Sequence, residues 1–241
     1  MDGVILVTGG SRGIGAATAL AAAHEGYGVA VVFRQEEARA AAVVQEIAAI
    51  GGKAAAIAGD VAQEDDVRRI FETAAGRLGP VTGLVNAAGI AGPFGTVAEL
   101  AAADIGRVLD INVAGTVLCC REAVRRMAAS GGGSIVNVSS VAARLGAPGS
   151  GVLYAASKGA IDSFTIGLAQ EVAAQGIRVN AVRPGLIDTE MQPPGRVEQM
   201  RDRLPMKRAG QAEEVAAAIV WLLGEHASYV SGAIMDVSGA R

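Results

Sequence analysis

A tyrosine and a lysine stand four positions apart in the stretch Y-A-A-S-K at 154–158. In a helix, residues at i and i+4 lie on one face, so Tyr154 and Lys158 would lie side by side. A tyrosine hydroxyl ordinarily has a pKa of about 10, and a nearby ammonium lowers that pKa because it favours the phenolate. The pair could therefore serve as a proton-transferring acid or base near neutral pH.

The residues that precede this pair strengthen the chemical interpretation. Taken alone, a tyrosine and a lysine at this spacing are most often an ordinary surface pair on a helix. Here the pair follows a β-branched run at 133–140 that ends in Ser139 and Ser140. A positioned serine hydroxyl can donate a hydrogen bond to an oxyanion that develops on a carbonyl. The serine, tyrosine and lysine together indicate chemistry on a carbonyl or an alcohol.

A glycine-rich loop, T-G-G-S-R-G-I-G, occupies residues 8–15. Gly9, Gly13 and Gly15 follow an apolar run directly and open an alanine-rich segment typical of a helix. Glycines permit the tight turn and let backbone N–H groups approach a pyrophosphate at the positive end of that helix. A glycine turn needed only for packing is the alternative. The position between a strand and a helix favours a dinucleotide site, although the spacing is G-x-x-x-G-x-G.

The end of the second apolar run bears on which dinucleotide binds. An NAD site usually has an acidic residue there to hold the ribose hydroxyls. This chain has Arg34 and Gln35 instead, and Arg34 could pair with a 2′-phosphate together with Arg12 of the loop. There are two alternatives. Arg34 could be only a solvated charge at the end of a strand, or Glu36 or Glu37 could hold the ribose hydroxyls of NAD. The sequence favours NADP(H) and leaves NAD(H) open.

Apolar β-branched runs alternate with helical segments along the whole chain. We predict strands at 4–9, 29–34, 53–60, 81–89, 133–140, 177–185 and 233–237, and helices at about 13–26, 36–51, 62–79, 104–129, 152–175 and 212–223. Alternation of this kind predicts crossover units and a parallel sheet that is buried on both faces. The predicted fold is α/β, a Rossmann-type doubly wound, mostly parallel sheet of about seven strands with helices on both faces. Without a repeat or a linker, residues 1–241 are expected to form a single domain.

Composition limits the classes of function. Of the 241 residues, 51% are hydrophobic and only 3% are aromatic, and the net charge is −3. The longest basic run is two arginines, which argues against a nucleic-acid partner. No apolar stretch reaches the ~20 residues of a membrane helix, and no signal peptide is expected, so the predicted location is cytoplasmic. Cys119 and Cys120 are expected to be buried on a helix, and no metal site is expected.

The motifs appear in an order that resembles a known family. They are T-G-G-S-R-G-I-G at 8–15, N-A-A-G at 86–89, Asn112, the serine pair at 139–140, Y-A-A-S-K at 154–158 and R-P-G at 183–185. The chain resembles the short-chain dehydrogenase/reductase family in its single-domain branch, from Val4 to the tail V-S-G-A. Within that branch it looks most similar to 3-oxoacyl-carrier-protein reductases and NADP-preferring sugar or alcohol dehydrogenases.

The resemblance implies roles for individual residues. Tyr154 would be the acid or base, Lys158 would bind the nicotinamide ribose, and Asn112 would hold a proton-relay water. Ser140 would hold the substrate carbonyl; Ser139 competes with it, but Ser140 lies closer to the usual spacing before the tyrosine. The implied cofactor-binding residues, besides the tyrosine, the lysine and Arg34, are Gly9, Ser11, Arg12, Gly13, Ile14, Gly15, Asp60, Val61, Asn86, Ala87, Ala88, Gly89, Pro184, Gly185, Ile187 and Thr189. Asp60 could equally be a helix-capping turn residue.

The segment after the sixth predicted strand bears on the substrate. The segment 187–210, rich in proline and methionine, is expected to be a substrate lid. Residues that could line the substrate side are Ile90, Phe94, Leu145, Val152, Met191, Met200 and Met206. Acyl-thioester ketones, sugars, small alcohols, steroids and small diketones are all compatible with the sequence, and a nucleotide-sensing regulator without turnover is the non-enzyme alternative. The resemblance also implies a homotetramer built on two long helices.

Overall fold

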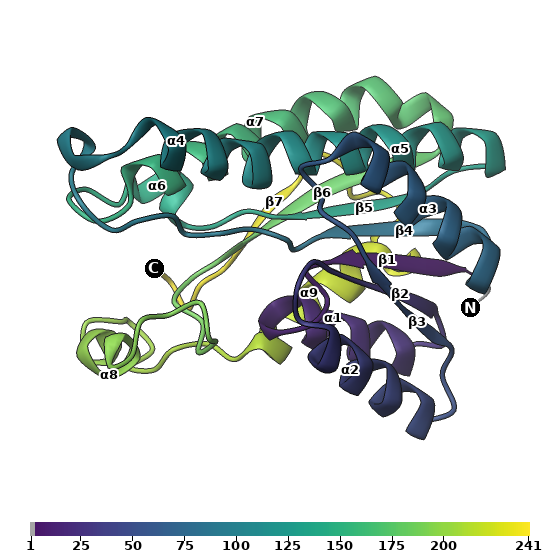
Figure 1. The fold of residues 1–241 in the computed structure, drawn as a ribbon, viewed down its shortest axis with the longest axis horizontal. Coiled ribbons are helices and arrows are strands. Elements are labelled where there is room, and N and C mark those ends of the chain that lie inside the picture. Colours follow the sequence, from purple (N-terminus) through teal and green to yellow (C-terminus); the bar gives the residue numbers. More distant parts are fainter. Residues whose placement is uncertain (1–2) are drawn as a thin grey trace.

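The computed structural model describes residues 3–241, whose strands form a parallel sheet in the order β3-β2-β1-β4-β5-β6-β7 (Figure 1). The strands are β1 (Val4–Thr8), β2 (Gly28–Phe33), β3 (Ala54–Ala58), β4 (Val81–Asn86), β5 (Gly133–Val138), β6 (Ile177–Pro184) and β7 (Ile234–Val237). Every neighbouring pair is parallel. The predicted α/β sheet is therefore confirmed.

Helices cover both faces of the sheet (Figure 1). One face carries α1 (Gly13–His24), α2 (Glu37–Ala49) and α9 (Ala212–Leu223), and the other carries α3 (Glu64–Leu78), α5 (Gly115–Ser130) and α7 (Val152–Val172). Shorter helices are α4 (Ala102–Leu109), α6 (Ala142–Leu145) and α8 (Arg196–Arg201), with 3-10 turns at Val97–Glu99, Ala173–Gln175 and Glu225–Ala227.

The alternation of side chains along β1 explains the two layers of core. Val4 and Leu6 pack with the residues of α3, α5 and α7, whereas Ile5 and Val7 pack with those of α1, α2 and α9. Successive strand residues point to opposite faces, so an all-apolar strand must be covered on both sides. Burial of each such large side chain contributes about 1.5–3 kcal/mol before entropy is counted.

Three local features differ from the sequence prediction. Several strands end earlier than predicted, and the run at 81–89 is a strand only to Asn86. The helix predicted over 104–129 is interrupted by a π-helical turn at Asp110–Ala114 that contains Asn112. The short helices α6 and α8 are not predicted at all, because they lie in glycine- and proline-rich segments where the apolar period is lost.

The order of the strands fixes where a ligand can bind. The chain leaves β1 toward β2 and β3 on one side, and β4 to β7 lie on the other. In open parallel sheets, ligands bind beyond the carboxyl ends of the strands at such a switch point. The predicted loop at 8–15 and the serine pair both follow strands at this edge.

Candidate active site

A cavity of about 630 Å³ opens at the carboxyl edge of the sheet. Its walls come from the segments that follow β1, β2, β3, β4, β5 and β6, together with α7 and α8. The cavity brings together nearly all the residues that the sequence singled out. Those that line it are Gly9, Ser11, Arg12, Gly13, Ile14, Gly15, Arg34, Asp60, Val61, Ala87, Ala88, Gly89, Ser139, Ser140, Tyr154, Lys158, Pro184, Gly185, Ile187 and Thr189.

The glycine loop has the backbone that a phosphate site requires. Gly9 has φ of 64° and Gly13 has φ of 52°, in the left-handed region that side chains disfavour. A Cβ atom on Gly15 would lie 2.2 Å from the carbonyl oxygen of Gly9, so only glycine fits this turn. The following helix α1 has no side-chain N-cap. Its first-turn N–H groups therefore remain free to bind an anion at the positive helix end.

Arg34 lies at the nucleotide side of the cavity, at the end of β2. Its Nη1 is 3.3 Å from Oδ2 of Asp60, and its side chain is 41% exposed. Asp60 is also a turn residue, because its Oδ1 accepts a hydrogen bond from the Ala62 N–H at 3.0 Å. Glu36 lines the cavity as well, whereas Glu37 is not among the lining residues. The Arg34 guanidinium is thus accessible from the cavity, but the carboxylates of Glu36 and Asp60 line the same part of it.

The adjacent serines, Ser139 and Ser140, form different hydrogen bonds. Ser139 Oγ donates to the main-chain carbonyl of Lys158 at 3.2 Å, which ties β5 to α7. Ser140 Oγ accepts from the Ala142 N–H at 3.1 Å. The Ser140 hydroxyl also acts on the Tyr154 side chain, so the two hydroxyl groups lie together in the cavity, where Ser140 can donate to a ligand.

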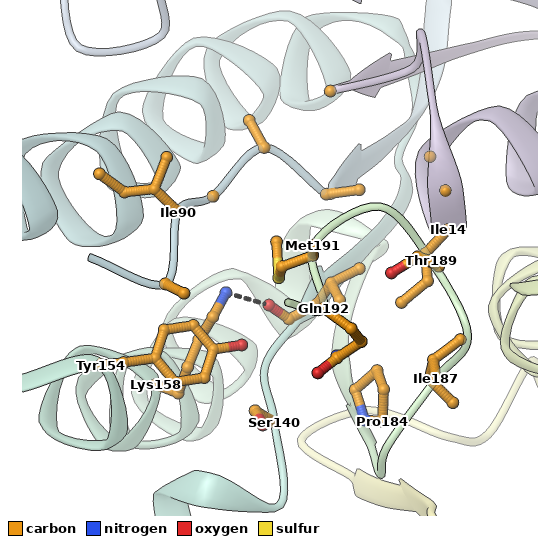
Figure 2. A pocket seen from close by; sticks show the side chains of 18 of the residues that line it. Ile14, Ile90, Ser140, Tyr154, Lys158, Pro184, Ile187, Thr189, Met191 and Gln192 are labelled. Carbon is orange, nitrogen blue, oxygen red and sulfur yellow. Dashed lines mark hydrogen bonds between the residues drawn. The ribbon is translucent and has the colours of Figure 1, made fainter. Parts of the chain in front are cut away.

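Tyr154 and Lys158 lie side by side on α7, as their spacing predicts (Figure 2). The Lys158 Nζ is 5.8 Å from the centre of the Tyr154 ring and donates a hydrogen bond to the Val138 carbonyl at 2.7 Å. The Tyr154 hydroxyl points toward the space between α7 and the segment after β6, where Pro184 and Ile187 lie (Figure 2). The side chains of Tyr154 and Lys158 thus line the same cavity as the residues at the end of β5.

Burial dominates the proton affinities of this pair. It lowers the pKa of Lys158 to about 8, and the nearby Asp162 carboxylate opposes that shift. Burial raises the pKa of Tyr154, and the Ser140 hydroxyl opposes that shift. The expected lowering of the tyrosine pKa is therefore not found in the protein alone. The reason is that removal of the phenolate from water is the largest influence on this hydroxyl and outweighs the hydrogen bond from Ser140.

Two predicted site residues do not line the cavity. Asn86 is buried, and its Nδ2 donates to Asn137 Oδ1 at 2.9 Å, which links β4 to β5. Asn112 is fully buried; its Oδ1 accepts from the Ile90 N–H, and its Nδ2 donates to the Ile90 carbonyl and to Ser157 Oγ. Both donors of the Asn112 amide are used within the protein, so this side chain positions the loop after β4. That Asn112 holds a proton-relay water stays a prediction.

The segment after β6 closes the opposite wall of the cavity (Figure 2). Glu190 in this segment accepts from Arg39 of α2 at 2.6 Å, which connects the predicted lid to the nucleotide side. Of the proposed substrate-side residues, Ile90, Phe94, Leu145, Met191 and Met200 line the cavity, whereas Val152 and Met206 do not. Sequence reasoning missed the lining residues Glu190, Gln192, Arg196 and Arg241, since no motif marks them.

Other reactive side chains lie outside the cavity. Cys119 and Cys120 are free and buried on α5, as expected, and burial raises the pKa of Cys119 to about 12. Among residues 3–241, no cluster of three or more His, Cys, Asp or Glu side chains could hold a metal ion. Within the same part of the chain, no helix is both long and apolar enough to cross a membrane.

Known proteins resemble this chain over its whole length. Residues 9–239 match the family model described as Enoyl-(Acyl carrier protein) reductase. The Escherichia coli protein named uncharacterized oxidoreductase YgfF is 55% identical over 99% of each chain. The human 3-oxoacyl-[acyl-carrier-protein] reductase is 41% identical over 99% of this chain and 98% of its own.

A solved structure agrees in three dimensions. A short chain dehydrogenase from Burkholderia cenocepacia, crystallised in complex with NADP, matches with a TM-score of 0.93 and 36% identity. The match covers 100% of this chain and 98% of that one. The sequence match, the sheet order and the cavity residues lead to the same conclusion: the chain belongs to the short-chain dehydrogenase/reductase family of oxidoreductases.

Proposed function

We propose that the protein is an NADP(H)-dependent oxidoreductase that transfers a hydride between the nicotinamide and a carbonyl or alcohol carbon. The observation that carries the proposal is the single cavity in which Ser140, Tyr154 and Lys158 face the end of a glycine loop. A site for polarising and protonating a carbonyl thus adjoins a site for a pyrophosphate.

The residues present fit a dinucleotide. The uncapped first turn of α1 and the glycine backbone suit the pyrophosphate. Arg34 and Arg12 would hold a 2′-phosphate, and Lys158 would hold the nicotinamide ribose. Pro184, Gly185, Ile187 and Thr189 would flank the nicotinamide from the segment after β6. The related Burkholderia cenocepacia enzyme in complex with NADP supports this choice of cofactor.

The chain's own residues supply the proton chemistry. When bound, the reduced cofactor supplies a hydride to the carbonyl carbon. Tyr154 donates its hydroxyl proton to the carbonyl oxygen, and its raised pKa keeps that proton in place until the oxygen becomes basic. Ser140 donates a hydrogen bond to the same oxygen as negative charge develops. The phenolate then regains a proton from solvent, and oxidation of the alcohol uses the same groups in reverse.

The substrate class that we favour is a 3-oxoacyl thioester. It is supported by the human relative that is named a 3-oxoacyl-[acyl-carrier-protein] reductase and by the apolar wall of Ile90, Phe94, Leu145, Met191 and Met200. A sugar or small alcohol dehydrogenase is the alternative within the family, and a nucleotide-sensing regulator is the alternative outside catalysis.

Acetoacetyl-CoA reduction tests the proposal. We expect purified protein to oxidise NADPH only when the ketone is present, and Tyr154→Phe to lose at least about 100-fold in rate while NADPH binding is retained. Turnover of glucose or of small alcohols, but not of the thioester, would instead identify the protein as a sugar or small alcohol dehydrogenase. Binding of NADPH without turnover of any carbonyl or alcohol would favour the regulator.

The cofactor preference is tested with Arg34. Arg34→Ala should raise the KM for NADPH about tenfold or more and leave the KM for NADH nearly unchanged, because only NADPH carries the 2′-phosphate. Arg77, which lies in the last turn of α3, supplies a matched control in Arg77→Ala. Equal use of both cofactors by the unmodified protein would contradict the assignment of NADP(H).

A further inference from the structure

Two arginines, Arg196 and Arg241, line the substrate side of the cavity without an acidic partner. Neither forms an ion pair within residues 3–241, and both side chains are partly buried. Arg196 begins α8, and its guanidinium lies over the ring of Phe94, 5.4 Å from the ring centre. A guanidinium held against an aromatic face keeps its N–H donors at the ring edge free for a ligand.

The acidic residues of the cavity lie elsewhere. Its lining includes the carboxylates of Glu36, Asp60 and Glu190. Glu36 and Asp60 follow β2 and β3 on the nucleotide side, and Glu190 pairs with Arg39 and lies beside Gly13 of the glycine loop. All three carboxylates are therefore associated with the nucleotide side of the cavity. The charged side chains that line the substrate side, Arg196 and Arg241, are thus both cationic, which favours an anion there.

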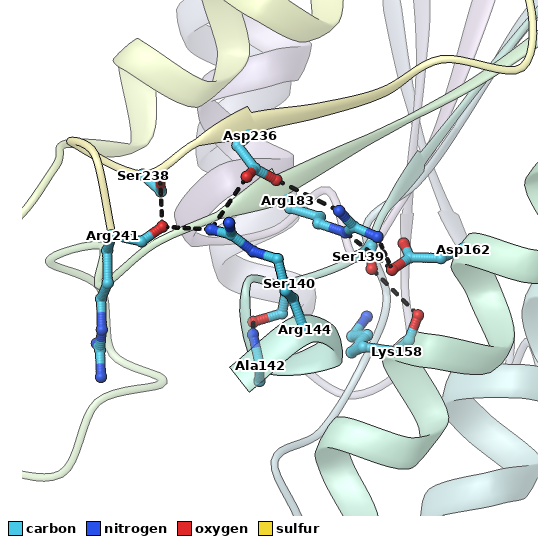
Figure 3. Close-up of polar contacts among 10 residues, drawn as sticks. All are labelled: Ser139, Ser140, Ala142, Arg144, Lys158, Asp162, Arg183, Asp236, Ser238 and Arg241. Carbon is cyan, nitrogen blue, oxygen red and sulfur yellow. Dashed lines mark hydrogen bonds and ion pairs between the residues drawn. The ribbon is translucent and has the colours of Figure 1, made fainter. Parts of the chain in front are cut away.

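A chain of ion pairs positions the backbone of Arg241 (Figure 3). Its carbonyl accepts a hydrogen bond from Arg144 Nη2 at 2.6 Å, and Arg144 also pairs with Asp236 of β7 at 3.2 Å. Asp236 lies 3.6 Å from Arg183 of β6, which pairs with Asp162 of α7 at 2.8 Å. The helix that carries Tyr154 is thus connected to Arg241.

The side chain of Arg241 itself is left for another partner. Figure 3 shows it pointing away from the Arg144 and Asp236 pair. The end of the chain lies between α6 and α8 (Figure 1). Gly239 packs against the segment that follows α8, since a Cβ atom on it would meet Met206 Sδ at 3.2 Å. Gly239 thus places the end of the chain against the segment after α8, and Arg241 and Arg196 line the same cavity.

We propose that Arg196 and Arg241 form an anion subsite that binds a phosphate or carboxylate group of the substrate while the substrate carbonyl lies at Ser140 and Tyr154. The subsite rests on the proposed function, because it orients a substrate for that reaction. Guanidinium groups match both anions through paired N–H donors. The anion is the phosphate of a phosphopantetheine arm if the substrate is a 3-oxoacyl thioester, or the carboxylate of a small keto acid.

Kinetics with matched substrates test the subsite. Acetoacetyl-CoA and the uncharged acetoacetyl N-acetylcysteamine thioester share one acyl group, and 4-oxopentanoate and its methyl ester form a second matched pair. In Arg196→Gln/Arg241→Gln, the KM of the anionic substrate relative to its neutral partner should rise about tenfold or more. The first pair reports a phosphate and the second a carboxylate. Arg201→Gln, on the same helix but outside the cavity lining, is the control.

A binding experiment separates this proposal from the proposed function. Coenzyme A, which has no carbonyl, and 4-oxopentanoate are each titrated by calorimetry into the full chain with excess NADP⁺. The unmodified protein should bind at least one of them, and the double variant should bind that ligand about tenfold more weakly. Weaker anion binding by the double variant, in a protein that does not reduce thioesters, would support the subsite and exclude a thioester as the substrate. Unchanged anion binding and unchanged KM ratios in the double variant would overturn the subsite.

Discussion

At the scale of single residues, neighbouring serines have different environments. Both line the cavity, but Ser139 is 2% exposed and donates to the Lys158 carbonyl, whereas Ser140 is 9% exposed and its hydroxyl acts on Tyr154. Identical side chains can therefore be assigned different tasks from their hydrogen bonds alone. One stabilises the contact between β5 and α7, and we propose that the other holds the substrate carbonyl.

Alanine at each serine should separate these tasks. Ser140→Ala should lower kcat for carbonyl reduction about 100-fold, because it removes a donor to the developing oxyanion. Ser139→Ala should lower the free energy of unfolding by about 1 kcal/mol through loss of a buried hydrogen bond, with a smaller effect on kcat. Steady-state kinetics and urea denaturation of both variants measure the two effects. A greater loss of kcat in Ser139→Ala would reverse the assignment.

Lys158 gives the protein a pH dependence of stability whose sign is fixed. Its pKa is about 8 in the folded protein and 10.5 ordinarily, so the folded state releases this proton first as the pH rises. Between these two values the unfolded chain binds more protons, and stability must increase with pH. Below pH 8 the buried charge opposes folding by a constant amount. We expect the Tm of the unmodified protein, relative to Lys158→Met, to be flat below about pH 8 and to rise above it.

Thermal unfolding followed by circular dichroism from pH 6 to pH 10 measures this difference. The methionine variant has nearly the same shape and no titrating group, so subtraction removes the contribution of other residues. Parallel Tm curves for the two proteins would show that Lys158 keeps its ordinary pKa in the fold.

At the scale of elements, the π-helical turn connects the loop after β4 to α7. The turn at Asp110–Ala114 places Asn112 where its amide bonds both main-chain groups of Ile90 and the hydroxyl of Ser157. A π turn inside a helix is rare and is frequently found at functional sites. Here it fixes Gly89 and Ile90, which line the cavity beside Lys158.

Removal of this amide should loosen the loop. Asn112→Ala should lower the free energy of unfolding by about 2–3 kcal/mol, because it leaves buried main-chain groups without partners, and it should weaken NADPH binding. Asp110→Ala, an exposed position in the same turn, is the control and should change stability little. Urea denaturation and fluorescence titration of NADPH measure both effects. Equal stability of the two variants would show that the bonds to Ile90 are dispensable.

How much of this could be predicted depends on the range of the interactions. The glycine loop between β1 and α1, and the pairing of Tyr154 with Lys158, follow from local periodicity and spacing. The π turn does not, because no residue type signals an extra residue in a helical turn. The partners of the Asn86 and Asn112 amides could not be predicted, and neither could the position of Arg196 at the cavity. These features depend on contacts between distant segments, which form only in the folded chain.

At the scale of the whole molecule, the sheet joins two halves of one site. The glycine loop and Arg34 come from the β1 to β3 half, and the serine, tyrosine and lysine come from the β5 to β6 half. The outer helices also expose apolar side chains, including Ile105 and Leu109 of α4 and Ile166 of α7. Such side chains are available for contacts between copies of the chain.

The homotetramer implied by the family resemblance remains a prediction at this scale. Sedimentation should give a mass four times the 24.2 kDa of one chain. Ile166→Glu, on the long helix α7, should dissociate the assembly because it buries a charge, whereas Ile50→Glu, after α2 on the other face, should not. A protein that sediments as one chain at micromolar concentration would contradict the tetramer.

The central claim is that Tyr154 and its neighbours support hydride transfer from a nicotinamide to a carbonyl. The most direct measurement uses NADPH deuterated at both C4 positions, with acetoacetyl-CoA, and mass spectrometry of the product. We predict one deuterium on the new alcohol carbon, with formation slowed at least about 100-fold in Tyr154→Phe. A product without deuterium, or a phenylalanine variant as fast as the unmodified protein, would contradict the account.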